Sequence, residues 1–510
     1  MQADTIVVGA GSSGAVIAAR ATENSANEVL LLEAGPDYPT NGVPPDLLDG
    51  TRNSMRLHDW GHMHRARPGR RLLFWFPRGR VVGGSSAVNT CIALRGQPAD
   101  YEEWASLGLR EWGWDACLPA FKRLENDLDV RNEWHSQEGP VPLRRHPPGE
   151  LVLWQQHFLE ACKALGFPRA DDANDPTSTG WGPHAMNKVD GERMSVARCY
   201  LTEGVRARRN LRIQAETIVR RVLFEGRRVR GLEIDVGGRV ETIESRRVVL
   251  CAGATATPGI LLRSGIGPRR DVERLGVDVL MDLPAVGARL LDHPGVAIFL
   301  RPKRSLRQNL RDPLIQTVLR YTSPDSRTPN DMIMQPGSVV PLPFMTLPLV
   351  SIMCSVGKPR GFGTIAFTSA DPRSKPRIES RLLVDDQDRR RAAEAMRLAA
   401  DLARTPPMRG EASFFWPPRR VVLNGASMKR WIGAIVDSGY HPCGTVPMGA
   451  DDAKAIDAAT DGRGRVRGVE GLAVADASLM PTIPTANTNL TTIMIGERFG
   501  EWAKSGQLFA

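Results

Sequence analysis

Uninterrupted runs of apolar residues mark three buried strands along this chain. Residues 5–8, 29–32 and 248–252 are such runs, and each is followed directly by a glycine or a glutamate. Runs that stay apolar at successive positions are typical of parallel strands that are covered on both faces. Residues 15–20, between the first two runs, are predicted to form a closely packed helix. This order of strand, helix and strand predicts an α/β unit with a parallel sheet near the N-terminus.

The middle of the chain has shorter and more regular alternations. Residues 212–213 and 218–219 predict short strands, and residues 229–236 with 241–243 predict a hairpin. Residues 389–404 carry apolar side chains three and four positions apart, which is the spacing of one helix face. A second region of mixed strands and helices is therefore expected after the first sheet.

Length and composition are those of a globular protein with more than one core. Of the 510 residues, 42% are hydrophobic and 24% are charged, which predicts two large domains or one domain with a large insertion. Lys and Arg exceed Asp and Glu by 10 (67 against 57), but these cations are scattered, and the run at residues 389–391 follows closely on three aspartates. Binding of nucleic acid is therefore not expected.

Cysteine usage and hydropathy indicate a reducing, aqueous compartment. The seven cysteines are widely spaced and contain no C-x-x-C pair, which disfavours a disulfide framework and a structural zinc site. The first strand begins at residues 4–5, which leaves no room for a signal peptide. No apolar run reaches the length of about 18 residues that a membrane span requires. The expected location is cytoplasmic.

A glycine-rich turn follows the first strand. Gly9 is expected to make the tight turn, Gly11 to let the backbone approach a pyrophosphate, and Gly14 to let helix pack on strand. The helix N-terminus would offer free N–H groups to the phosphates. Glu33 ends the second strand nineteen residues after Gly14, the spacing at which a carboxylate reaches ribose hydroxyls and disfavours a 2′-phosphate. The expected ligand is FAD or NAD rather than NADP.

Four further segments decide between these two dinucleotides. Residues 77–96 form a loop rich in glycine and serine that can offer many backbone N–H groups to an extended polar ligand. This segment resembles the first signature of the glucose–methanol–choline (GMC) oxidoreductases, and residues 253–268 resemble the second. Residues 286–293 are similar to the VGxNLxDH segment of that family, and residues 369–376 to a stretch of its substrate domain. Because the matches occur in the family's order over nearly the whole chain, the cofactor is expected to be FAD. Among the branches of the family, the C-terminal motif is most like that of bacterial hydroxymethylfurfural and aryl-alcohol oxidases and of choline dehydrogenase-like members.

The resemblance also implies a fold class and a division into domains. The expected architecture is an α/β FAD-binding (Rossmann-like) domain plus an α+β substrate domain with an antiparallel sheet. The FAD-binding domain would combine residues 1–148, 210–292 and 440–510, and the substrate domain residues 149–209 and 293–439. The proline-rich residues 324–348 are expected to be irregular and to cover the substrate pocket.

The C-terminal motif carries the expected catalytic chemistry. His441 opens a stretch of the form HP-x-GT-x-x-MG, and an Ala-Asn-Thr-Asn sequence ends at Asn489. An alcohol must lose its hydroxyl proton as its C–H bond breaks, and an imidazole with a pKa near 6.5 is a suitable base. The family match makes His441 that base and Asn489 a partner that positions the substrate oxygen. Alternatively, Asn489 caps a helix that begins at Leu490, and both roles can hold together.

The resemblance implies further contacts with the cofactor and the substrate. Gly439 and Tyr440 would contact the substrate. FAD would be bound non-covalently, because Val88 occupies the position at which choline oxidase-like proteins carry the histidine that attaches it. The predicted cofactor-binding residues are Gly9, Gly11, Ser12, Ser13, Gly14, Glu33, Ala34, Arg80, Val82, Gly84, Ser85, Asn89, Thr90, Ile92, Val219, Asp476, Ala477, Leu490 and Thr491.

The predicted function is therefore FAD-dependent oxidation of a primary, aryl or otherwise apolar alcohol to an aldehyde. The small-molecule substrate would reduce the flavin, and oxygen or a quinone-type acceptor would reoxidise it. Two alternatives remain open: a lyase or decarboxylase on the same scaffold, and a non-catalytic flavoprotein that transfers electrons. A metal site is not expected, because His58, His62 and His64 have no further ligand at suitable spacing.

Overall fold

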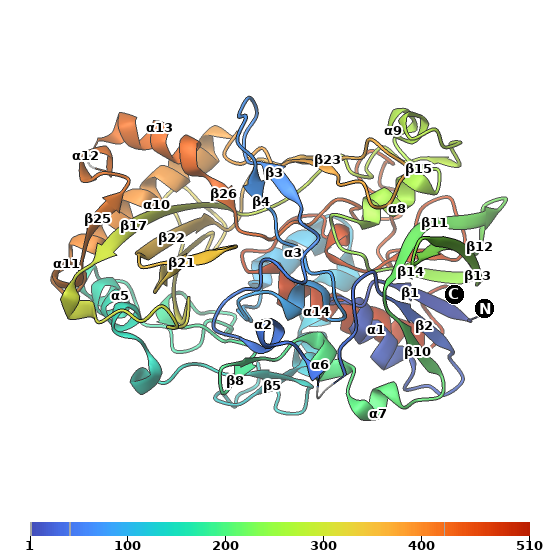
Figure 1. Ribbon diagram of the computed structural model, residues 1–510, viewed down its shortest axis with the longest axis horizontal. Coiled ribbons are helices and arrows are strands. Elements are labelled where there is room, and N and C mark those ends of the chain that lie inside the picture. The colour runs from blue at the N-terminus through green and yellow to red at the C-terminus, as the bar shows by residue number, and fades with distance from the viewer. Residues whose placement is uncertain (1–2, 40–41, 423) are drawn as a thin grey trace.

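Two sheets, one parallel and one mostly antiparallel, occupy opposite ends of the long axis of the molecule (Figure 1). A computed structural model describes residues 3–39, 42–422 and 424–510. The expected pairing of an α/β region with a region built on an antiparallel sheet is therefore confirmed.

The parallel sheet contains the three strands that the apolar runs predict. Its strand order is β10 (Leu211–Gln214), β2 (Val29–Leu32), β1 (Thr5–Val8), β14 (Arg247–Leu250) and β27 (Leu472–Val474). Helix α1 (Gly14–Ala21) packs against α14 (Thr488–Lys504) beside this sheet. Strands from distant parts of the sequence thus assemble one sheet, and its inner strands β2, β1 and β14 bury apolar side chains on both faces.

A smaller antiparallel sheet adjoins the parallel one. It consists of β11 (Thr217–Glu225), β12 (Arg228–Val236) and β13 (Arg239–Glu244), in that order. The hairpin expected at residues 229–236 and 241–243 is present with slightly longer strands. Helix α8 (Thr257–Arg263) packs on β11.

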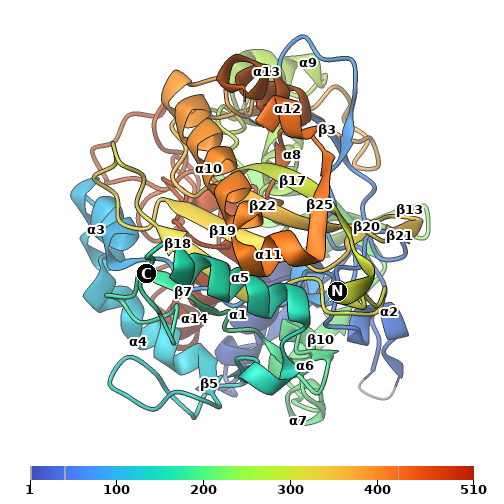
Figure 2. The same cartoon turned by 90° about the vertical axis from the view of Figure 1, so that its left-hand side faces the viewer.

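The large antiparallel sheet is backed by helices. Its strand order is β25 (Ala412–Trp416), β17 (Pro294–Pro302), β22 (Val350–Val356), β19 (Met332–Gly337), β18 (Thr317–Tyr321) and β7 (Gly180–Pro183), with β26 (Asp437–Ser438) paired to β17. Figure 2 shows three helices in front of this sheet: α5 (Leu153–Ala164), α10 (Asp386–Arg404) and α11 (Pro406–Glu411). Helix α10 begins three residues before the expected start, because the Asp385 carboxylate caps it by accepting the N–H groups of Gln387 and Asp388.

The two hydrophobic cores do not follow the expected domain limits everywhere. Val196 and Tyr200, from the segment assigned to the substrate domain, are buried in the core of the parallel sheet. Ala66, from the segment assigned to the FAD-binding domain, is buried in the core of the antiparallel sheet. Strands β3 (Met63–Arg65) and β24 (Arg377–Glu379) pair with each other and join the two regions.

The remaining elements are short and connect these layers. The helices are α2 (Pro45–Leu48), α3 (Pro98–Ser106), α4 (Trp114–Leu124), α6 (Val196–Tyr200), α7 (Glu203–Arg206), α9 (Arg269–Arg274), α12 (Arg419–Val422) and α13 (Gly425–Ile435). The strands are β4 (Phe74–Trp75), β5 (Glu125–Asp127), β6 (Val141–Leu143), β8 (Lys188–Val189), β9 (Glu192–Arg193), β15 (Ile266–Gly267), β16 (Met281–Asp282), β20 (Val340–Leu342), β21 (Met345–Leu347) and β23 (Thr364–Ala366). The proline-rich segment is irregular only in part: residues 324–331 form no helix or strand, whereas the rest contains β19 and the hairpin β20–β21, of which Val340 and Leu342 line the cavity described next.

Candidate active site

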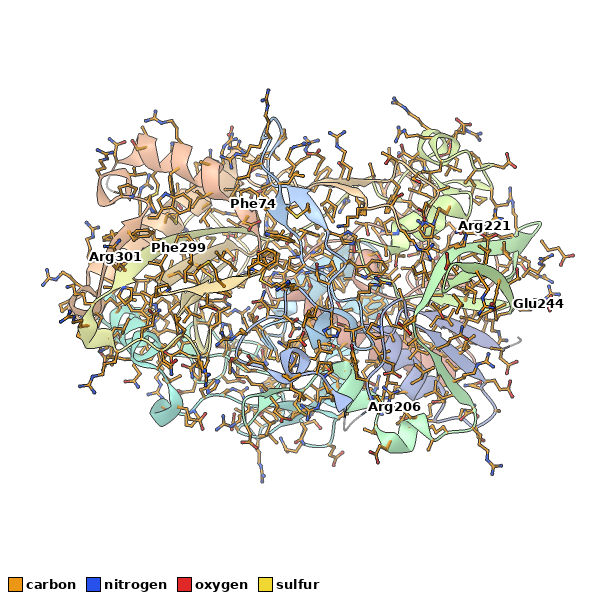
Figure 3. The ribbon with its side chains drawn as sticks, viewed as in Figure 1. Phe74, Arg206, Arg221, Glu244, Phe299 and Arg301 are labelled. Carbon is orange, nitrogen blue, oxygen red and sulfur yellow. The ribbon has the colours of Figure 1, made fainter. Side chains whose placement is uncertain are left out.

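A cavity of about 980 Å³ lies between the two sheets. This volume is at the upper end of the range of roughly 300–1,000 Å³ that is usual for small-molecule sites. Its lining joins the glycine turn after β1 to aromatic side chains of the substrate half, including Phe299 on β17 and Phe74 on β4 (Figure 3). One end is therefore polar and rich in backbone amides, and the other is apolar.

Two glycine loops form the polar end. A Cβ on Gly9, where φ is +101°, would lie 2.5 Å from the Cys251 carbonyl oxygen, and a Cβ on Gly14 would lie 1.9 Å from the Gly9 oxygen. Gly84, at φ +52°, comes so close that its Cβ would lie 2.6 Å from the Gly11 Cα. Only glycine allows this approach of turn, helix and second loop. The backbone of both loops is thereby exposed to the cavity, as a bound pyrophosphate requires.

Glu33 lies at the end of β2, where its carboxylate holds the glycine turn together. One oxygen accepts the Ala10 N–H at 3.0 Å and the other accepts the Gly35 N–H at 2.9 Å. Burial raises the pKa of Glu33 to about 7. The carboxylate also lines the cavity, so contact with a ribose stays a prediction. Glu33 also has a structural role, because both of its oxygens hold backbone amides.

Most of the predicted binding residues surround this cavity. Those that line it are Gly9, Gly11, Ser12, Ser13, Glu33, Ala34, Arg80, Gly84, Ser85, Asn89, Thr90, Ile92, Val219, Gly439, Tyr440, His441, Asp476, Ala477 and Asn489. The Ser13 hydroxyl is buried without a hydrogen-bond partner in the described part of the chain, which suits a phosphate-binding turn. The residues present therefore fit a dinucleotide.

Four predicted residues do not line the cavity. Gly14 lies under the glycine turn and Val82 is buried behind the second loop. Leu490 packs into the core, and the Thr491 hydroxyl is paired with the Tyr101 hydroxyl at 2.9 Å. Helix α14 begins at Thr488, so Thr488 and Thr492, one turn apart, face the cavity in place of the two expected residues.

The same helix start changes the expected partner of His441. Asn487, rather than Asn489, is the residue at the N-cap position of α14, and its Nδ2 lies 2.9 Å from the Nε2 of His441. Asn489 is inside the first turn, where its Oδ1 accepts the Ser12 hydroxyl at 2.7 Å. The structure therefore places Asn487, and not Asn489, against His441 and at the start of the helix, while contact of Asn489 with the substrate oxygen stays a prediction. The pair is His441 and Asn487.

His441 is held against His293 by one buried carboxylate. Oδ1 of Asp292 accepts the backbone N–H of His293 at 2.8 Å and that of His441 at 3.0 Å. The Nδ1 atoms of the two imidazoles are 2.9 Å apart. The protein thus fixes both rings at their backbones and at their facing edges.

The hydrogen-bond chain assigns the proton positions of both rings. His293 Nε2 lies 2.9 Å from the carbonyl oxygen of Pro484, which can only accept, so this nitrogen carries the proton. In a neutral ring His293 Nδ1 is then unprotonated and accepts from the Nδ1–H of His441. The Nε2 of His441 is left unprotonated, and its lone pair accepts from the Asn487 amide. His441 is therefore in the tautomer that can take a proton on its Nε2 side.

The surroundings also keep His441 neutral. Burial lowers its pKa well below the usual value, and His293 and the Arg78 guanidinium add to this effect. Arg78 lines the cavity and donates to the carbonyl oxygen of Tyr440 at 2.6 Å. Tyr440 itself has a left-handed φ of +63°, which turns the chain immediately before His441.

Several functional candidates were not expected from the sequence. His293 lies in the VGxNLxDH-like segment, and its Nδ1 lies 2.9 Å from that of His441. Arg78 and Asn487 lie inside motifs that the sequence analysis identified, but no sequence pattern indicates that their side chains point towards Tyr440 and His441. Spacing along the chain gives no sign of the His293–His441 contact, which joins positions 148 residues apart.

His58, His62 and His64, which are close in sequence, each contact different side chains. His58 contacts Tyr38 and Asp46, and His64 contacts Ser380 and Asp437. His62 stacks on Trp60 with ring centroids 6.1 Å apart. No shared coordination point joins the three among the contacts of the described residues.

A different cluster has the composition of a metal site. Potential ligand atoms of Glu125, Asp127 and His135 lie within 4.8 Å of one another. However, Arg95 pairs with Glu125 and Arg145 with Asp127, each at 2.8 Å. Burial lowers the pKa of His135, but hydrogen bonds to Asp127, Asp172 and Glu125 outweigh burial and raise it to about 10. This cluster is an ion-pair network whose positive charges are already supplied by the protein.

Comparisons with known proteins agree over nearly the whole chain. The family model for GMC oxidoreductases matches residues 3–295 in its N-terminal part and 359–496 in its C-terminal part. The chain is 36% identical to 5-(hydroxymethyl)furfural oxidase of Methylovorus sp. (strain MP688), with 98% of each chain covered. It is 32% identical to oxygen-dependent choline dehydrogenase of Photobacterium profundum, with 97% of this chain and 92% of the other covered.

A solved structure shows the same fold. Pyridoxine 4-oxidase from Mesorbium loti superposes with a TM-score of 0.88 at 29% identity, and 98% of each chain is covered. Among the helices that the structure describes, none has the length and apolarity needed to cross a membrane.

Proposed function

The chain belongs to the GMC oxidoreductase family, and we propose that it oxidises a primary alcohol on an aryl or otherwise apolar skeleton to the aldehyde, with His441 as the base. FAD is the cofactor of this family. The relatives named as acting on hydroxymethylfurfural and choline support an alcohol as the substrate. The apolar end of the cavity, with Phe74, Phe299 and Met353, favours an apolar one.

The observation that carries this proposal is the tautomer of His441. An alcohol hydroxyl needs an unprotonated acceptor while its C–H bond breaks, and Nε2 of His441 is unprotonated in this tautomer. Bound FAD would supply the acceptor for the hydride of the alcohol carbon. His441 takes the hydroxyl proton. Asn487, which does not ionise, orients the imidazole ring of His441 and the substrate oxygen relative to each other.

The rest of the site supports the same chemistry. The glycine loops, Ser13 and Glu33 would hold the dinucleotide half of FAD. The N-terminus of α14 opens onto the cavity through Thr488 and Asn489, and its positive end stabilises negative charge that develops there. Arg78 adds a fixed positive charge beside Tyr440.

Anaerobic mixing of the FAD-loaded protein with a panel of alcohols tests this function. Bleaching of the visible flavin band by aryl or apolar primary alcohols is the expected result. A lyase, decarboxylase or passive electron carrier would leave the band unchanged with every alcohol. Repeating the reaction in air with peroxide detection, and again with a quinone, decides which acceptor the protein uses.

A further inference from the structure

The carbonyl oxygen of Pro484 is linked to His441 by hydrogen bonds through His293. This oxygen accepts from His293 Nε2 at 2.9 Å and thereby directs the His293 lone pair towards His441. Pro484 belongs to the loop of residues 481–487, which leads into α14. One loop carbonyl is therefore connected to Nδ1 of His441 through the ring of His293.

Two buried charged residues hold this loop on both sides of Pro484. On one side, Nζ of Lys358 donates to the carbonyl oxygen of Ile483 at 2.7 Å. On the other, Oδ2 of Asp100 accepts both the N–H and the hydroxyl of Thr485 at 2.8 Å. The two charges also pair, since Lys358 Nζ lies 3.2 Å from Asp100 Oδ1. Residues 483 and 485 are thus tied to one ion pair, and the carbonyl of residue 484 lies between the two ties.

The burial of this pair is unusual for a loop support. The Asp100 side chain is fully buried and that of Lys358 is 14% exposed. Burial lowers the pKa of Lys358, but Asp100 and Glu103 outweigh burial and hold the pKa above its usual value, so the ammonium stays charged. A buried pair is costly in free energy unless its hydrogen-bonding atoms are satisfied, and here part of them are satisfied by the loop itself. Neither residue lines the cavity.

We propose that Lys358 and Asp100 are positioning residues that set the proton position on His441 through Pro484 and His293. The inference rests on the proposed role of His441 as base. If the loop carbonyl moves, His293 can carry its proton on Nδ1 and donate to His441. The proton of His441 then occupies Nε2, and no lone pair faces the substrate. The ion pair thus determines which nitrogen of His441 carries the proton, and it is not needed to hold the backbone fold of the site.

The test measures tautomers and reduction rates in the same variants. Lys358→Met removes the donor to Ile483, Lys358→Arg restores a cation, and Thr485→Val removes a hydroxyl with little change in volume. Imidazole ¹⁵N NMR of histidine-labelled holoenzyme reports the protonated nitrogen of each ring, and the chain has only 9 histidines to assign. Arg145→Met, which breaks the ion pair of Arg145 with Asp127 away from the cavity, is the control for general loss of stability.

In Lys358→Met we expect His441 to shift towards protonation at Nε2 and anaerobic flavin reduction to slow by about 10- to 100-fold, with FAD affinity unchanged. Lys358→Arg should recover most of the wild-type tautomer of His441 and most of the wild-type rate of flavin reduction. Thr485→Val should shift them in the same direction by less, which keeps the test open if Lys358→Met does not fold. Arg145→Met should leave the tautomer unchanged. Wild-type tautomers and rates in folded Lys358→Met and Thr485→Val would overturn the proposal. If instead the wild-type flavin is never reduced by alcohols, the proposed function fails, and the NMR result still decides whether this pair sets the tautomer.

Discussion

The imidazoles of His293 and His441 face each other with their Nδ1 atoms 2.9 Å apart, so a single proton lies between them. Both rings are neutral, because burial lowers the pKa of His293 to about 4 and that of His441 well below its usual value. The Pro484 carbonyl decides which ring owns the shared proton, and the remaining lone pair is left at Nε2 of His441.

Asn487 and Asn489 should separate in a mutational test, because their side chains have different partners. Asn487→Ala removes the donor to His441 Nε2 and should slow anaerobic flavin reduction by about tenfold or more, at unchanged FAD affinity. Asn489→Ala removes the acceptor of the Ser12 hydroxyl and should weaken FAD retention while leaving the reduction rate close to wild type. Stopped-flow reduction and FAD titration of both variants check this. The reverse pattern would make Asn489 the partner of His441 after all.

These two residues also show where prediction from sequence ends. The buried strands, the glycine turn and the approximate site of α14 follow from apolar runs and from glycines at positions that no other residue can occupy. The start of α14 does not, because helix ends are ambiguous by one or two residues. At Ala-Asn-Thr-Asn that ambiguity decides which asparagine faces His441. The neighbouring Pro484 and Lys358 could not be predicted at all, since their roles depend on contacts between distant segments.

Glu33 is expected to matter for both cofactor binding and stability. Glu33→Ala removes the acceptor of the Ala10 and Gly35 N–H groups as well as any ribose contact. FAD affinity should fall by on the order of 1.5–3 kcal/mol, and the apoprotein should also lose thermal stability. FAD titration and thermal unfolding of the apoprotein measure the two effects. Loss of affinity at unchanged apoprotein stability would show that the backbone contacts contribute little.

Acid should destabilise the protein through its buried histidines. The pKa values of buried His293 and His62 are lowered to about 4, and that of His184 to about 3, chiefly by burial. Each folded pKa lies below the unfolded value near 6.5, so the unfolded state binds more protons. The stability that these groups contribute is fully present above pH 6.5 and is lost as pH falls towards 4. Thermal unfolding between pH 8 and 4.5 should show this decline. A midpoint that stays constant down to pH 4.5 would contradict the assignment of these rings as neutral.

FAD should be released when the protein is precipitated with acid. The side chain at position 88 is a buried valine, which cannot form a bond to flavin. Absorbance of the supernatant after precipitation with trichloroacetic acid measures the released fraction. Yellow colour that stays in the pellet would indicate a covalent link through another residue.

The rate of anaerobic flavin reduction in His441→Ala tests the central claim most directly. Steady-state turnover is less informative, because reoxidation can change independently. His441→Ala should retain FAD and reduce it about 10²- to 10⁴-fold more slowly with a good alcohol substrate, as the loss of a general base usually gives. His157→Ala, on α5, is a matched control that should behave as wild type. Reduction of His441→Ala at the wild-type rate would show that the base lies elsewhere.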